Sequence, residues 1–282
     1  MQKVIIFSFI ALFFLGVAVS SKANSSGTGF LVNSEGYILT NNHVVFTSVR
    51  TKNKKRRVAL CRHLNIKSQN INGPAKLIAW NKSIDLAILK LFKGSVKGNV
   101  TIASFEPERP RKGWQNLNSV LNESDSSSVN NLKSNASGIS YVRFADTQIQ
   151  PGANISLFGF PLGKYVSSQL MVNSGIVVAT TGPRNNDNLI QIDAAANPGN
   201  SGSPVLNSSG NLVGILSGGI KSFKKGPKNI EGFNFAIKSA VAERFLHSKG
   251  IQVIKSPSTQ VQSRTVQYQK ALRSVVHIAC SM

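Results

Sequence analysis

A serine that could act as a nucleophile lies in the segment DAAANPGNSGSPVLN, residues 193–207. Ser201 is surrounded there by Pro198, Gly199 and Gly202, and glycine permits the positive φ angles and the close backbone approach of a tight loop. Such a loop can direct successive backbone N–H groups outward, as an anion-binding concavity requires. The same residue types also form ordinary hairpin turns, so this segment alone leaves both interpretations open.

One histidine and one aspartate elsewhere could activate this serine. A serine hydroxyl becomes nucleophilic when a histidine takes its proton and a buried carboxylate holds that histidine in the right tautomer. His43 follows the apolar run YILT, and Asp85 precedes the run LAILKL as the sole acid between Glu35 and Glu106. Taken singly, His43 is more typical of a structural residue and Asp85 of a loop or helix cap. With Ser201 they occur in the order His, Asp, Ser of chymotrypsin-like serine proteases.

The elements that must position these residues are expected to be strands. Short apolar runs rich in Val, Ile and Leu alternate with Gly, Asn and Ser, a pattern typical of an all-β sandwich or barrel. A Ser- and Asn-rich segment, 105–140, divides this region into two parts of similar size. Chymotrypsin-like proteases fold as two six-stranded antiparallel β-barrels, so the resemblance in residue order implies that architecture here, with a C-terminal helix. His43 and Asp85 would come from the first barrel and Ser201 from the second.

The N-terminus resembles a secretory signal. Lys3 precedes the apolar run VIIFSFIALFFLGVAV, which small polar residues follow, the pattern of a signal peptide. Cleavage is expected after Ser20 or Ala23. The run is shorter than the roughly 20 residues of a membrane span, so an uncleaved anchor is the less favoured alternative. We therefore expect an exported chain, periplasmic or extracellular.

Two helices are expected beside the strands, and the whole chain is expected to have five parts. A helix is predicted in KSAVAERFLHSKG, because Val241, Phe245 and Leu246 share one face and Gly250 suits its C-terminal cap. Apolar residues spaced from Val261 to Ala279 permit one further amphipathic helix, for which docking on a barrel is favoured over a membrane or partner role. The parts are a signal peptide (1–23), the first barrel (24–104), the insertion (105–140), the second barrel with its helix (141–250) and a basic tail (251–282).

The charge of the chain bears on its partners. Lys and Arg number 33 against 11 Asp and Glu, a formal net charge of +22, and such an excess attracts polyanions. Basic runs at 52–57 and 221–228 motivate an alternative function, a non-catalytic binding protein that holds polyanions or unfolded chains. Solvated basic loops explain the same runs without any dedicated partner, and nothing indicates a specific nucleic acid.

The two cysteines and four histidines give no metal site. Cys61 and Cys280 are the only cysteines; outside the cytosol they can pair, or Cys61 can stay free on an apolar strand. Because there is no CxxC motif and no His/Cys cluster, neither a metal nor another cofactor is predicted.

Five blocks in this sequence resemble the HtrA/Deg family of exported serine proteases. They cover about residues 25–248 apart from the insertion, in the order SSGTGFLVNSEGYILTNNHVV, DLAILKL, VNSGIVVATTG, IQIDAAANPGNSGSPVLNSSGNLVGI and GFNFAIKSAV. The resemblance implies that His43 is the general base, that Asp85 orients it and that Ser201 is the acylated nucleophile. It also implies an oxyanion hole formed by the backbone N–H groups of Gly199 and Ser201. The implied substrates are unfolded or damaged proteins and peptides, as in protein quality control.

The resemblance also gives expectations about substrate binding. The position six residues before the serine, an aspartate in trypsin-like enzymes, is Ala195, and Ala196 follows, so we expect cleavage after small or medium apolar residues. A substrate backbone is expected to pair with an edge formed by Ser217, Gly218 and Gly219, by strand addition.

Other positions differ from related proteases. Asn200 replaces the aspartate that pairs with a new N-terminus in digestive enzymes, which argues against activation by that route, and Ser203 replaces a common glycine. The 32 residues after Gly250 are too few for the PDZ domains of many HtrA proteins, and a homo-oligomer stays an open possibility.

Overall fold

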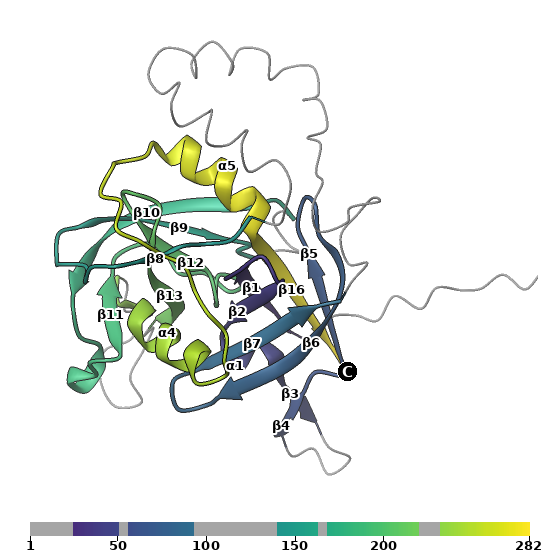
Figure 1. The fold of residues 1–282 in the computed structure, drawn as a ribbon. Helices are drawn as coiled ribbons and strands as arrows, with labels where there is room; N and C mark the ends of the chain where they lie inside the picture. Colours follow the sequence, from purple (N-terminus) through teal and green to yellow (C-terminus); the bar gives the residue numbers. More distant parts are fainter. Residues whose placement is uncertain (1–24, 51–55, 93–139, 163–167, 220–231) are drawn as a thin grey trace, which may run out of the picture.

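The computed structural model describes residues 25–50, 56–92, 140–162, 168–219 and 232–282, which form two β-barrels side by side (Figure 1). The predicted signal peptide, almost all of the 105–140 insertion and most of both basic runs lie outside the described residues. Within the described ranges, no helix has both the length and the apolar character needed to cross a membrane.

The first barrel is a closed ring of six strands that pair antiparallel throughout. After β2 (Tyr37–Thr40) a single helical turn, α1 (Asn42–Val45), leads into a hairpin of β3 (Phe46–Arg50) and β4 (Arg56–Leu60). Apolar side chains such as Leu31, Ile38 and Leu89 fill the interior and are fully buried. In ring order the strands are β1 (Ser25–Leu31), β16 (Val275–Ser281), β5 (His63–Lys67), β6 (Asn72–Asn81), β7 (Leu86–Leu91) and β2 (Tyr37–Thr40).

The second barrel is also a closed antiparallel ring of six strands, because β12 (Pro204–Asn207) pairs with both β9 (Asn154–Gly159) and β13 (Leu212–Gly219). Two short strands, β8 (Phe144–Ala145) and β15 (Lys255–Ser256), extend its sheet in parallel. The expected fold of two six-stranded antiparallel barrels with a C-terminal helix is therefore confirmed. In ring order the strands are β9 (Asn154–Gly159), β10 (Met171–Ala179), β11 (Leu189–Ile192), β14 (Asn234–Lys238), β13 (Leu212–Gly219) and β12 (Pro204–Asn207).

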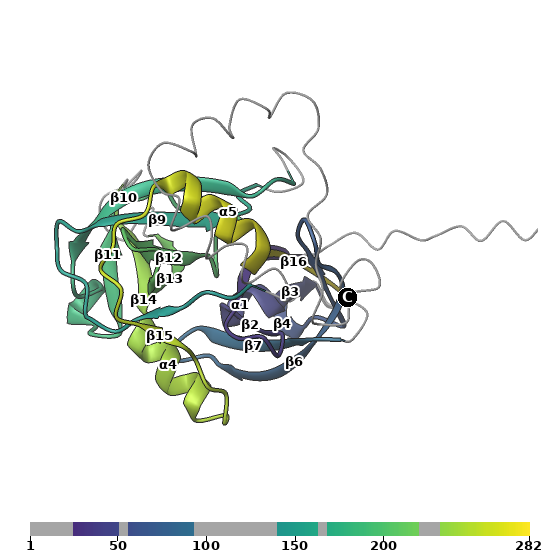
Figure 2. The ribbon, with the colours of Figure 1, turned by 45° about the horizontal axis from the view of Figure 1, so that its top comes forward.

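Two helices complete the described fold, apart from α1 and a short 3-10 turn, η1 (Pro183–Asn185). Helix α4 (Ser239–His247) lies where the apolar spacing predicts a helix, and Gly250 follows it with a φ of +72°. Helix α5 (Arg264–Ser274) has Ser263 as its N-cap, whose hydroxyl accepts the Val266 N–H. Figure 2 shows α5 running from the second barrel towards the first, where it continues into β16.

The C-terminal segment differs from the single helix expected through Ala279. The helix ends at Ser274, and the chain continues as strand β16 between β1 and β5 of the first barrel. The physical reason is local: Val275, Val276 and Ile278 are β-branched residues, which favour a pleated, buried surface over a helix. All three are at most 1% exposed. The segment therefore supplies one of the six strands of the barrel.

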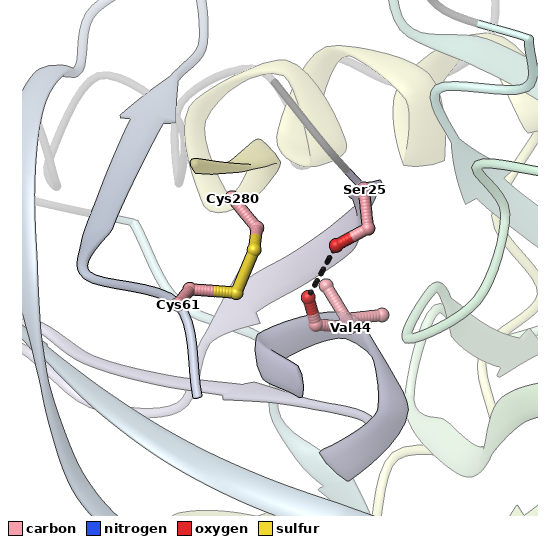
Figure 3. The surroundings of a disulfide bond; sticks show 4 residues. All are labelled: Ser25, Val44, Cys61 and Cys280. Carbon is pink, nitrogen blue, oxygen red and sulfur yellow. Dashed lines mark hydrogen bonds between the residues drawn. A yellow bond between two sulfur atoms is a disulfide. The ribbon is translucent and has the colours of Figure 1, made fainter. Parts of the chain in front are cut away.

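Cys61 and Cys280 form a disulfide, which decides between the two alternatives that the sequence left open. Their Cα atoms are 5.5 Å apart across a sequence separation of 219 residues, and the bond links the connection between β4 and β5 to β16. Figure 3 shows the disulfide beside Ser25 and Val44, where the Ser25 hydroxyl donates a hydrogen bond of 3.3 Å to the Val44 carbonyl. The disulfide thus secures β16 next to the helical turn α1.

Loss of this disulfide is expected to lower the free energy of unfolding by about 2–5 kcal/mol, because the cross-link restricts the unfolded chain. Guanidinium unfolding of the wild type and of a Cys61→Ser/Cys280→Ser double variant, each with and without reductant, measures the effect. Reductant should bring the wild type to the level of the double variant and leave that variant unchanged. Coincident curves for the oxidised wild type and the double variant would contradict this expectation.

Candidate active site

His43 and Asp85 meet at one end of the first barrel. His43 lies in α1 directly after β2, and Asp85 lies in the turn between β6 and β7. The His43 ring nitrogen Nδ1 is 2.8 Å from Asp85 Oδ2 and 3.1 Å from Oδ1, and the His43 backbone N–H donates to Oδ1 at 3.1 Å. With the proton on Nδ1, Nε2 keeps a free lone pair and can act as a base.

Asp85 is held in an uncommon backbone conformation, with a φ of +53°. Its carbonyl accepts the Asn42 N–H at 3.1 Å and the Asn41 side-chain amide at 3.0 Å. These bonds from the residues just before His43 stabilise a left-handed conformation that non-glycine residues seldom adopt. Consequently the same two segments that bring the carboxylate to the imidazole also keep the turn in place.

A hydroxyl from the second barrel completes the surroundings of the carboxylate. The Ser217 hydroxyl in β13 donates to Asp85 Oδ2 at 2.8 Å. The His43 side chain is 49% exposed and that of Asp85 26%, so the imidazole is open to an incoming substrate while the carboxylate behind it is mostly covered. Asp85 therefore joins the two barrels at the point where the candidate base is exposed.

Ser201 lies at the same junction, in the loop between β11 and β12. Its hydroxyl donates to the Ser217 carbonyl at 3.5 Å, a long hydrogen bond, and no hydrogen bond joins Ser201 to His43 among the described residues. Such bonds are often long or misaligned in a ligand-free enzyme, and a change of the Ser201 χ1 rotamer re-aims the hydroxyl. The structure thus connects Ser201 to Asp85 through Ser217.

The backbone around Ser201 needs glycine at two positions. Gly199 has a φ of +99° and Gly202 one of +87°, and a Cβ atom would collide with the Phe160 carbonyl at the first and with the Thr28 carbonyl at the second. The Pro198 carbonyl accepts the Leu162 N–H at 2.6 Å. Since the C=O and N–H of a trans peptide unit point in opposite directions, this bond directs the Gly199 N–H away from Leu162.

The segment that precedes the loop is fixed to two neighbouring strands. The Ala194 carbonyl accepts the Asn234 side-chain amide at 2.9 Å, and the Ala195 carbonyl accepts that of Asn173 at 3.3 Å. Ala195 is exposed and Ala196 is half-buried. Only methyl groups are therefore presented at the two positions where the sequence predicts the specificity pocket.

The end of β13 extends beyond its partner on one side. Strand β12 begins at Pro204, which pairs with Ile215, so it does not extend opposite Gly218 and Gly219, whereas β14 does. Among the described residues, Ser217, Gly218 and Gly219 thus have no strand partner on the side of Ser201, where the sequence predicts the substrate backbone.

Sequence reasoning gave no role to one residue at this junction, Thr28 of β1. Its N–H donates to the Ser201 carbonyl at 2.8 Å, and its hydroxyl donates to the Gly199 carbonyl at 2.8 Å. The signal available in the sequence was its place between Gly27 and Gly29 in the block GTGF, although a pattern within one strand cannot reveal a partner that is more than 170 residues away.

Residues 27–215 match the protein family described as "Trypsin-like peptidase domain". The serine protease Do-like HtrA of Bacillus subtilis is 31% identical over 82% of this chain and 42% of its own length. A probable periplasmic serine endoprotease, DegP-like, of a Marinomonas species is 28% identical over 78% of this chain and 34% of its own length. The uncharacterised protein y4bJ of Sinorhizobium fredii is 24% identical over 92% of this chain and 32% of its own length. The chain thus spans less than half the length of these relatives.

His277 of β16 is expected to make the stability of the fold sensitive to acid. Its ring lies edge-on to the Phe160 ring at 5.7 Å between centroids, and burial lowers its pKa below the usual 6.5, with a further contribution from Lys67 opposite it. The unfolded chain therefore binds this proton more tightly than the folded one. Stability should be complete above about pH 6.5 and fall as the pH decreases from there towards the lower folded pKa.

Chemical unfolding at about pH 5.5 and at about pH 7.5 tests this expectation. His277→Gln should weaken the loss of stability at the lower pH, while His63→Gln, at an exposed position of the neighbouring strand β5, serves as the matched control. An unchanged pH dependence in His277→Gln would show that His277 is not responsible.

Proposed function

Because the chain belongs to the family of trypsin-like peptidase domains, we propose that it is an HtrA/Deg-type serine endopeptidase that uses His43, Asp85 and Ser201. One observation carries the proposal: the Asp85 carboxylate accepts both His43 Nδ1–H and the Ser217 hydroxyl, while the Ser217 carbonyl contacts the Ser201 hydroxyl. A protein that only binds polyanions or unfolded chains has no need of this arrangement.

In the proposed reaction the Ser201 oxygen attacks the carbonyl carbon of the scissile peptide while His43 Nε2 takes the hydroxyl proton. The resulting oxyanion accepts hydrogen bonds from the backbone N–H groups of Gly199 and Ser201. The tetrahedral intermediate collapses as His43 returns the proton to the departing amine, which leaves Ser201 acylated. Water then attacks the ester carbonyl while His43 Nε2 takes a water proton, and collapse of the second tetrahedral intermediate returns this proton to the Ser201 oxygen and releases the acid product. Asp85 keeps the proton on Nδ1 and stabilises the imidazolium that forms in each half.

The proposed substrates are exported chains that have unfolded or been damaged. A Marinomonas relative is described as a periplasmic endoprotease, which supports export and agrees with the signal-like N-terminus. An extended chain can pair with the free edge of Ser217, Gly218 and Gly219 only where its own backbone is accessible. Unfolded segments meet this condition and the interiors of folded proteins do not.

Hydrolysis of unfolded casein tests the nucleophile and its orienting carboxylate. Ser201→Ala should abolish acyl-enzyme formation, and Asp85→Asn should lower turnover by about 10⁴-fold, because the asparagine side chain favours the wrong imidazole tautomer. A fluorophosphonate should label the wild type, with the modification mapped to Ser201. Equal hydrolysis by the wild type and Ser201→Ala would refute the proposal.

Cleavage of a peptide library tests the specificity pocket. With methyl groups at Ala195 and Ala196, kcat/KM should be at least about tenfold higher for Ala or Val than for Lys at the residue before the cut. Ala195→Asp should raise kcat/KM for Lys and Arg, since it introduces a carboxylate at the pocket. A wild-type preference for Lys would contradict the assignment, and Ala196→Ser provides an uncharged control.

A further inference from the structure

A single buried side chain of the first barrel bonds to the loop that carries Ser201. Thr28 in β1 is 0% exposed. Its hydroxyl donates to the Gly199 carbonyl at 2.8 Å and accepts the Phe160 N–H at 3.1 Å. Its backbone N–H donates to the Ser201 carbonyl at 2.8 Å. Thr28 therefore binds the loop on both sides of Asn200.

These bonds restrict the two N–H groups to which the proposed mechanism assigns the oxyanion. The carbonyls of Pro198, Gly199 and Ser201 are all engaged, the first by Leu162 and the other two by Thr28. Fixing the carbonyls on both sides of Gly199 determines its φ and ψ angles and hence the direction of its N–H. The Ser201 N–H belongs to the peptide of the Asn200 carbonyl, which accepts the Ser203 N–H at 2.9 Å. Thr28 fixes the carbonyls of the two flanking peptides, those of Gly199 and Ser201, and so limits the orientation of this peptide further.

The hydroxyl of Thr28 is difficult to replace. A threonine hydroxyl has one donor and can accept, and here the donor serves one main-chain carbonyl while an acceptor site serves one main-chain N–H. A valine of the same shape fills the space but leaves both of these buried groups without that partner. The backbone of Gly159 also passes closely, since a Cβ there would lie 3.1 Å from the Thr28 hydroxyl oxygen.

The C-terminal strand supports this arrangement from the other side of β1. Thr28 pairs with His277 of β16, and the His277 ring contacts the ring of Phe160, whose own N–H binds the Thr28 hydroxyl. Thr40 adds a further bond, because its hydroxyl donates to the Thr28 carbonyl at 2.7 Å.

We infer that Thr28 is a positioning residue for the oxyanion site. It does not reach the substrate; it holds the Gly199 and Ser201 amides in the direction that stabilises the tetrahedral intermediate. This inference rests on the proposed function. Since the oxyanion is present only in the transition state and the intermediate, loss of the Thr28 hydroxyl should lower kcat and leave KM nearly unchanged.

The test compares Thr28→Val with Thr28→Ser in peptide hydrolysis. Thr28→Val should lower kcat by about 10- to 10³-fold, up to the loss typical of a whole oxyanion donor, while Thr28→Ser, which keeps the hydroxyl, restores most of the rate. Thr40→Val is the matched control: it removes a neighbouring buried hydroxyl but leaves the bonds to Gly199 and Phe160 in place. Its kcat should fall less than that of Thr28→Val at a similar melting temperature.

The outcomes separate this inference from the proposed function. An active wild type with an equally active Thr28→Val overturns the role of Thr28 alone, and so do parallel losses of kcat in Thr28→Val and Thr40→Val. A wild type that neither hydrolyses peptides nor reacts with a fluorophosphonate overturns both proposals. If Thr28→Val does not fold, Thr28→Ala removes the same hydroxyl without added bulk, and a kcat equal to that of Thr28→Ser would again overturn the inference.

Discussion

The Asp85 carboxylate is the interaction on which the rest of the site depends. It accepts hydrogen bonds from His43 of its own barrel and from Ser217 of the other, so a single side chain sets how the two barrels present their functional groups. A partly buried carboxylate needs such partners, because removing it from water without them is costly. The left-handed backbone of Asp85 adds a further cost, which the bonds from Asn41 and Asn42 offset. The turn between β6 and β7 therefore positions the carboxylate, and the carboxylate gains its hydrogen bond from Ser217 only when the two barrels are packed together.

The first barrel depends on a strand from the far end of the chain. Without β16, both β1 and β5 would present unpaired edges, and β1 is the strand that carries Thr28. The disulfide secures β16 at Cys280, opposite Ser25 in the register, and Figure 3 shows how close this point lies to Val44. Val44 directly follows His43, so the same closure supports the segment that carries the candidate base.

Sequence alone predicted the two barrels better than the connections that support them. The order of His43, Asp85 and Ser201 and the runs of short apolar strands suffice for two barrels with a junction, since local patterns determine strands. The pairing of β1 with β16 could not be predicted from local patterns. Neither residues 25–30 nor residues 275–280 carry a sequence signal that identifies the other segment as a partner. The spacing up to Ala279 fits a helix as well, and only the β-branched run after Ser274 favours a strand. The disulfide stayed open for the same reason, as spacing in sequence gives no distance in space.

The segment after Gly250 ties together the two halves of the site. Helix α5 contacts the second barrel through Gln267, whose side-chain amide donates to the Asn207 and Ser208 carbonyls, and through Tyr268, whose hydroxyl donates to the Leu170 carbonyl. The strand that follows it lies in the first barrel. Because the loop that carries Ser201 is held by Leu162 of one barrel region and Thr28 of the other, its geometry is sensitive to any shift between the barrels. Because the segment after Gly250 contacts both barrels, it limits that shift. The packing of this segment therefore helps to fix the geometry around Ser201.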